Sequence, residues 1–171
     1  MKLLYLLRHA KSSWSDPDLR DLDRPLAPRG RRATAALAGH LRRADIQPAL
    51  VLCSPARRTI ETFERIASAF DTEVTLLVDD ELYGSSAEEL MHRLRDLPET
   101  LSSVMVIGHN PVLQTLAVLL AGGGEPSALE RLRAKLPTGA LATLAIPDDS
   151  WRAIEPGRAR LVGFVTPKEL A

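Results

Sequence analysis

Short apolar runs that alternate with segments of helical spacing are the feature that most constrains how this chain can fold. The apolar runs cover residues 2–7, 49–54, 73–78, 102–108, 139–146 and 159–165. Apolar residues recur at helical spacing within 29–44, 56–70, 86–94 and 111–121. This alternation is typical of an α/β domain in which helices cover a mostly parallel sheet.

The runs also predict how the sheet is covered. The first, second and fourth runs are continuously apolar, which indicates strands buried on both faces. The last two runs are separated by turn residues around Pro147 and Pro156, and they predict an antiparallel portion. We therefore expect one domain over residues 1–171, built as three α/β/α layers around a mostly parallel, mixed sheet of about six strands.

Basic side chains stand at the ends of three runs. Arg8 and His9 follow the first run, Arg57 and Arg58 follow the second, and His109 follows the fourth. Sheets of this kind bind ligands beyond the carboxyl ends of their strands. Arginine forks bind phosphate oxygens, and a neutral histidine can attack phosphorus. The pattern predicts a phosphoryl-transfer site with the first Arg-His pair at its floor.

Two predicted helix starts lie at the same edge. Ser54 before Pro55, and Asn110 before Pro111, are expected to cap and open helices. Both N-termini would direct free N–H groups and the positive end of a helix dipole toward a bound anion.

The composition of the chain limits the classes of partner that it can bind and indicates the compartment in which we expect it. Lys plus Arg equals Asp plus Glu at 22 each, which argues against a general binder of nucleic acid or membranes but leaves room for local basic patches. The lone Cys53 ends an apolar run and is expected to be an inert core thiol in a reducing compartment. The N-terminal apolar stretch is too short for a secretion signal, so we expect a cytoplasmic protein.

Three motifs, "LLRHAKSSW", "CSPARRTIET" and "VIGHNP", resemble the histidine phosphatase (phosphoglycerate-mutase-like) superfamily. The short chain and the segment "DRPLAPRG" look like its SixA branch, the phosphohistidine phosphatases. The resemblance implies a phosphoglycerate-mutase-like fold and hydrolysis that uses neither a metal ion nor an organic cofactor.

The resemblance also implies roles for individual residues. His9 would be the nucleophile that becomes phosphorylated, and Arg8, Arg58 and His109 would bind the phosphoryl oxygens. Lys11 and Ser12, which follow the first motif, are expected to contact substrate at the rim of the site.

The sequence departs from the family pattern at several positions. Ala10 stands where many members carry glycine, and Ser15 stands where many carry an asparagine that contacts phosphate. Glu81 in "DDELYGSS" is the nearest candidate for the general acid of the wider superfamily. Phosphohistidine needs such an acid less, because its imidazole leaves with little proton donation, whereas an alkoxide leaving group needs one more.

The predicted reaction is hydrolysis through a covalent phosphohistidine on His9, with a phosphohistidine-bearing signalling or phosphotransfer protein as the expected substrate. One alternative is a small-molecule phosphomonoesterase or mutase, and a second is a non-catalytic module that recognises phosphate. The aspartates between residues 16 and 23 are expected in a solvated loop, and the glycines at 122–124 in a turn. The sequence indicates no oligomeric state.

Overall fold

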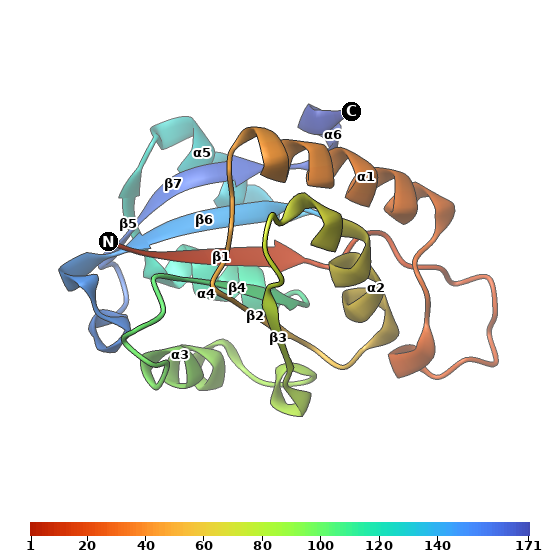
Figure 1. Ribbon diagram of the computed structural model, residues 1–171, viewed down its shortest axis with the longest axis horizontal. Coiled ribbons are helices and arrows are strands. Elements are labelled where there is room, and N and C mark those ends of the chain that lie inside the picture. Colours follow the sequence, from red (N-terminus) through yellow and green to blue (C-terminus); the bar gives the residue numbers. More distant parts are fainter.

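The strand β1 (Lys2–Arg8) lies at the centre of a seven-stranded sheet in the computed structural model, which describes residues 1–171 (Figure 1). The strand order is β3-β2-β4-β1-β6-β7-β5. The other strands are β2 (Leu50–Cys53), β3 (Thr75–Val78), β4 (Ser103–Gly108), β5 (Ala121–Gly124), β6 (Leu141–Ile146) and β7 (Ala159–Val165). The helices are α1 (Pro28–Arg43), α2 (Arg57–Ile66), α3 (Ala87–Arg95), α4 (Val112–Leu120), α5 (Pro126–Ala134) and α6 (Pro167–Leu170).

The pairing of these strands confirms a mostly parallel, mixed sheet. Strands β3, β2, β4 and β1 pair in parallel, and so do β5 and β7. Strand β6 runs antiparallel to both β1 and β7, which confirms the antiparallel portion predicted from the last two apolar runs.

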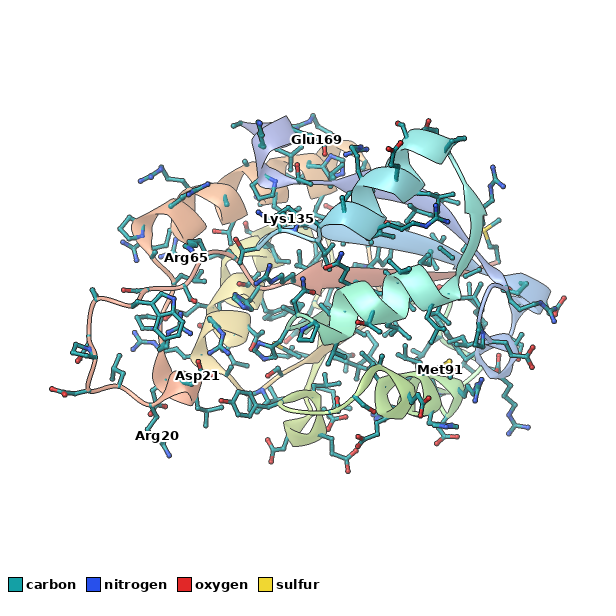
Figure 2. All side chains as sticks on the ribbon, turned by 180° about the vertical axis from the view of Figure 1, so that it is seen from behind. Arg20, Asp21, Arg65, Met91, Lys135 and Glu169 are labelled. Atoms are coloured by element: carbon teal, nitrogen blue, oxygen red, sulfur yellow. The ribbon has the colours of Figure 1, made fainter.

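Strand β1 shows why both faces of the sheet are covered. Successive side chains of a strand point to opposite faces, and here Leu4 and Leu6 enter one hydrophobic core whereas Tyr5 and Leu7 enter the other. Helices α3, α4 and α5 contribute to the first core, and α1 and α2 contribute to the second. Figures 1 and 2 show these two faces, and the three-layer prediction is confirmed. None of the helices is both long enough and apolar enough to cross a membrane.

The seventh strand is a correction to the predicted count of about six. The glycines expected in a turn belong to the edge strand β5, which pairs with β7. A Cβ atom on Gly122 would lie 1.8 Å from the carbonyl oxygen of Gly157, so the two backbones approach too closely for any side chain. Glycine is depleted in strands, and the strand therefore carries no local sequence signal.

Both predicted helix starts are also early, by two residues for α2 and by one for α4. Helix α2 has Ala56 as its N-cap and α4 has Pro111, and neither cap makes a side-chain hydrogen bond. The helices still begin close after the carboxyl ends of β2 and β4. The Ser54 hydroxyl contacts His109 in the site, whereas Asn110 still accepts a backbone N–H from the first turn of α4.

We expect Gly30→Ala to destabilise the protein by about 3 kcal/mol or more, because overpacking against fixed backbone cannot relax. A Cβ at Gly30, in the first turn of α1, would lie 2.1 Å from the carbonyl oxygen of Lys11. Gly39 in the same helix is the matched control, because its Cβ would meet only the flexible side chain of Arg43. Gly39→Ala should be neutral or stabilising by up to about 1 kcal/mol. Urea unfolding of both variants measures the difference, and equal stabilities would contradict it.

Candidate active site

The register of the central strands brings the two histidines together. Strands β1 and β4 pair with Arg8 opposite Gly108, so His9 and His109 follow on adjacent strands at the same edge. The backbone N–H of His9 donates to the carbonyl of Gly108 at 3.1 Å. The two imidazole ring centroids lie 5.4 Å apart. Residues a hundred positions apart in the chain thus share one site because parallel strands end together.

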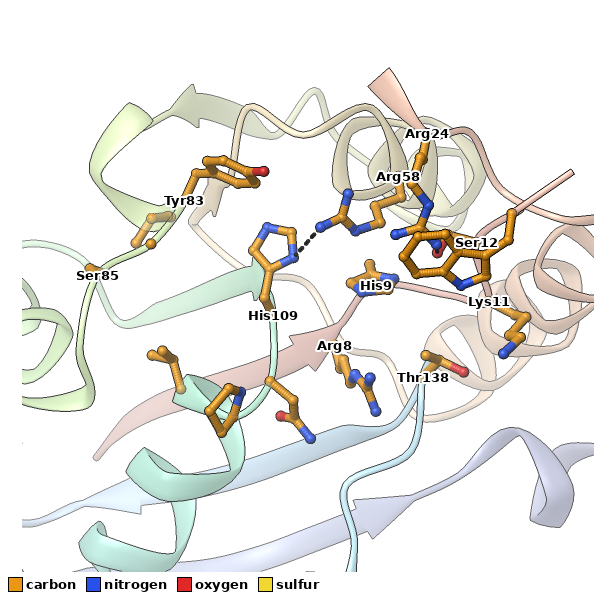
Figure 3. A pocket seen from close by; sticks show the side chains of 16 residues that line it. Arg8, His9, Lys11, Ser12, Arg24, Arg58, Tyr83, Ser85, His109 and Thr138 are labelled. Carbon is orange, nitrogen blue, oxygen red and sulfur yellow. Dashed lines mark hydrogen bonds between the residues drawn. The ribbon is translucent and has the colours of Figure 1, made fainter. Parts of the chain in front are cut away.

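Arg58 reaches the same place from the other neighbour of β4. It is the second residue of α2, which follows β2, and β2 pairs in parallel with β4. Its Nη2 lies 3.4 Å from Nδ1 of His109, as the dashed line in Figure 3 shows. Arg57, one residue earlier, is exposed and pairs with Glu61 instead.

One cavity of about 700 Å³ collects most of the predicted site residues. Those that line it are Arg8, His9, Lys11, Ser12, Arg58 and His109. Figure 3 shows their side chains around this hollow, with His9 between Arg8 and Arg58. The structure therefore brings together every predicted residue except Glu81.

Glu81 does not line the cavity. It lies in the short helix η3 (Asp80–Leu82) and is exposed to solvent. The same loop sends Leu82, Tyr83 and Ser85 to the cavity wall in its place. The expectation that Glu81 reaches the reacting group is not met, because the turn after Asp79 directs its carboxylate outward.

The environment of His9 fixes its protonation and its tautomer. Burial lowers the pKa of the imidazole to about 3, and the nearby His109 and arginines act in the same direction. Its Nδ1 lies 2.7 Å from the carbonyl oxygen of Ala10. A carbonyl oxygen only accepts, so Nδ1 carries the hydrogen and Nε2 keeps its lone pair. His9 is thus a neutral imidazole with one nitrogen free to attack.

Ser54 and Thr62 hold the histidines in place, and both were missed as functional residues. Ser54 is fully buried, and its Oγ lies 2.8 Å from Nε2 of His109. The Oγ1 atom of Thr62 accepts the backbone N–H of Ala10 at 3.1 Å and so fixes the peptide after His9. Asn110 Nδ2 donates to the carbonyl of Leu136 at 3.0 Å, and its Oδ1 accepts the backbone N–H of Gln114 in the first turn of α4 at 3.2 Å.

Arg8 keeps unused hydrogen-bonding capacity at the site. Its Nη1 donates to the carbonyl of Leu136 at 3.0 Å, but its buried Nε has no partner. An unpaired buried donor of this kind is costly. An oxyanion held beside Arg8 would supply the missing acceptor.

Asp21 is the main finding that the sequence did not predict. It was expected in a solvated loop, yet its carboxylate lies 3.0 Å from Nη2 of Arg58 and 2.9 Å from Nη1 of Arg24. The Tyr83 hydroxyl donates to the same carboxylate at 2.7 Å. Burial alone would raise the pKa of Asp21, but the hydrogen bonds from Tyr83, Arg24 and Arg58 outweigh it and lower the pKa to about 2. Asp21 is therefore an anion that orients Arg58.

Arg24 extends this network to the rim. Its Nη2 donates to Ser12 Oγ, and its guanidinium carbon lies 3.2 Å from the ring centroid of Trp14. The indole is 72% exposed and lines the cavity. The rim of the cavity thus carries an exposed aromatic side chain.

We expect acid to destabilise the protein through its buried histidines. Burial lowers the pKa of His9 to about 3 and, together with Arg58, that of His109 to about 4. The unfolded chain therefore binds more protons than the folded protein below about pH 6.5, and stability falls as the pH falls. At about pH 5 the loss is about 2 kcal/mol for each histidine.

Urea unfolding at neutral pH and at about pH 5 measures this loss. His9→Asn should remove about half of it, whereas His92→Asn, at an exposed position in α3, should leave it unchanged. An acid loss in His9→Asn as large as that of the unmodified protein would contradict the burial argument.

Comparisons with known proteins agree with this geometry. A family model described as the histidine phosphatase superfamily (branch 1) matches residues 4–83. An uncharacterised protein of Mycobacterium tuberculosis is 36% identical over 166 residues, which cover 95% of this chain and all of that protein.

Two solved structures are similar over nearly the whole chain. One is a protein of Nakamurella multipartitia assigned as the phosphohistidine phosphatase SixA, with 29% identity, a TM-score of 0.82 and coverage of 97% of this chain and 96% of that one. The other, from Agrobacterium tumefaciens and with the same assignment, has 31% identity, a TM-score of 0.79 and coverage of 97% and 98%.

Proposed function

We propose a reaction for this chain from the premise that it belongs to the histidine phosphatase superfamily, in its SixA-type branch. The chain is a phosphatase that acts through a histidine. Our proposal is that His9 is that histidine and that the substrate is a phosphohistidine on another protein.

The neutral state of His9 supports its role as the nucleophile in the first step. Its free Nε2 attacks the substrate phosphorus, and the bond between phosphorus and the substrate imidazole breaks. That imidazole leaves with the bonding electron pair and takes up a proton from solvent water. Water then attacks phospho-His9, the phosphorus–nitrogen bond breaks, and the products are inorganic phosphate and neutral His9. Each step exchanges one bond to phosphorus for another, so no oxidant or reductant is required.

The cationic side chains around His9 would stabilise the negative charge that the phosphoryl oxygens carry in both transition states. Arg8 and Arg58 would hold the equatorial oxygens, and His109, which follows the adjacent strand β4, would contact a third. Positive groups fixed in advance stabilise the charge on a transferring phosphoryl group. We propose that these side chains supply the charge without a metal ion, so a chelator should leave turnover unchanged.

The observation that carries the choice of substrate is the lining of the cavity. None of its sixteen residues is Asp or Glu, and the low pKa of the nearby Asp21 keeps it ionised at neutral pH. An alkoxide leaving group needs a proton donor, which typically contributes about 10² to 10⁴ in rate. An imidazole leaving group needs little such help, so the cavity fits phosphohistidine better than a sugar or serine phosphate.

A substrate panel tests this choice. We expect kcat/KM for a phosphohistidine peptide to exceed that for phosphoserine peptides and sugar phosphates by at least about 10²-fold. Phosphate release is the readout, and His9→Ala is the blank for contaminating phosphatases. Comparable hydrolysis of the sugar phosphates would point to the small-molecule alternative. No turnover of any member of the panel would point to a phosphate-recognition module.

The same proposal places the enzyme with phosphotransfer or signalling proteins in the cytoplasm. Cys53 is a buried free thiol, and burial raises its pKa to about 12. A reducing compartment suits such a lone, unpaired thiol.

A further inference from the structure

A second cavity adjoins the cavity that contains His9, which we call the phosphoryl cavity. It has a volume of about 630 Å³, and it shares Arg8, Lys11 and Thr138 with the first. From this shared wall it extends between the start of α1 and the segment that links α5 to β6, and α6 closes its far side. We call it the basic channel. A chain that carries a phosphoryl group into the first cavity would meet this channel at once.

The basic channel concentrates positive charge in a protein whose net charge is zero. Besides Arg8 and Lys11, its cationic residues are Arg29, Lys135 and Lys168, and no Asp or Glu lines it. The five cations come from four separate segments of the chain, so no single basic run in the sequence reveals them. Figure 2 shows Lys135 just beyond the end of α5.

The carboxylate of Glu169, next to the channel residue Lys168, is already bound elsewhere. Glu169 follows Lys168 in α6, and its Oε1 accepts from Arg131 at 2.9 Å and from Thr166 Oγ1 at 3.0 Å. Lys11, Arg29, Lys135 and Lys168 have no ion-pair partner within 4.0 Å. The start of α1 adds to the field, since its N-cap Ala27 offers no side-chain acceptor and its first turn contains no acid. The channel therefore holds unneutralised charge that an anionic ligand would balance.

The kind of cation indicates the kind of anion. Three of the five are lysines, and Lys11, Arg29, Lys135 and Lys168 are all exposed. Lysine is a point charge on a flexible stem, whereas a second phosphate group is best gripped by the rigid arginine fork. Mobile ammonium groups spread along a channel suit several carboxylates whose positions vary from one partner to the next.

We propose that the basic channel binds acidic side chains that flank the phosphohistidine of a protein substrate. The inference rests on the proposed function, because the phosphohistidine must first occupy the cavity beside His9. Charges of this kind at the rim of an interface chiefly raise the rate of association and select the partner. The channel thus supplies the specificity that an open phosphoryl cavity lacks.

Two synthetic peptides test the inference. Each carries one phosphohistidine, which is flanked by glutamates in one peptide and by glutamines in the other. At low ionic strength we expect kcat/KM to be about tenfold or more higher for the glutamate peptide, with the difference shrinking as salt screens the charges.

Charge reversal locates the effect in the channel. In the triple variant Arg29→Glu, Lys135→Glu and Lys168→Glu, the preference for the glutamate peptide should disappear or invert. The matched control reverses three exposed arginines outside both cavities, Arg43→Glu, Arg152→Glu and Arg160→Glu, and so changes the net charge equally. The two triple variants are compared at about 0.1 M salt, where the screening length is about 10 Å. The control should then keep most of the preference, because its reversed charges line neither cavity.

The outcomes separate this inference from the proposed function. Equal turnover of the two peptides by the unmodified protein would overturn the inference and leave the function standing. Failure to hydrolyse either peptide would overturn the proposed function itself. Equal loss of preference in both triple variants would show that net charge, and not the basic channel, selects the acidic peptide.

Discussion

Replacement of His9 by alanine is expected to lower kcat/KM by at least about 10⁴-fold and to abolish the covalent phosphoenzyme. The reason lies in the different engagement of the two histidines. His9 commits Nδ1 to the carbonyl of Ala10 and keeps Nε2 free. His109 has Arg58 at one nitrogen and Ser54 at the other, so neither of its nitrogens is free to attack. Of the two imidazoles, only His9 has the lone pair that a nucleophile needs.

Labelling with a radioactive phosphohistidine peptide measures the intermediate directly. The unmodified protein should acquire an acid-labile, base-stable label, and His9→Ala should acquire none. His92→Ala, which changes an exposed histidine of α3, is the control for loss of an imidazole far from the site. A label that persists in His9→Ala but disappears in His109→Ala would show that His109, and not His9, is the nucleophile.

The meeting of Arg8, His9, Arg58 and His109 could be predicted because the sequence encodes strands strongly. Buried parallel strands are continuous apolar runs, and a basic residue directly after such a run must lie at the carboxyl edge of the sheet. The distinction between Arg57 and Arg58 came from the family motif. The structure gives its physical basis: the helical turn after β2 points Arg58 inward and leaves Arg57 beside Glu61.

The site residues that the sequence did not predict lie in segments that show neither helical nor strand periodicity. Asp21 and Tyr83 are 62 positions apart, one at the start of a short 3-10 helix and the other just after a second one, and they meet only in the folded protein. Ser54 fits a helix cap by its neighbours, but its hydroxyl serves His109 instead. Glu81 and Tyr83 differ by two positions in one short loop, and the local turn alone decides which of them faces the cavity.

The Asp21 network orients the two arginines that it contacts, Arg24 and Arg58. The Arg58 guanidinium donates to the backbone carbonyl of Asp21 at 2.7 Å and to its carboxylate at 3.0 Å. These bonds fix one side of the planar fork and leave its Nε edge without a protein partner. A substrate phosphoryl group would therefore meet an arginine that is already oriented, which lowers the conformational entropy lost on binding.

Replacement of Arg58 is accordingly expected to have the second large effect on activity. Arg58→Ala should lower kcat/KM by about 10³-fold or more, the range typical of an arginine that stabilises a transferring phosphoryl group. Arg58→Lys keeps the charge but loses the fork that reaches Asp21 and His109 together, so it should recover only a minor part of the activity. Arg57→Ala is the matched control, since that side chain is exposed on the same turn, and it should stay within about twofold of the unmodified protein. Steady-state kinetics with the phosphohistidine peptide decide the matter. Activity restored fully by lysine would mean that charge alone, and not the oriented fork, stabilises the transition state.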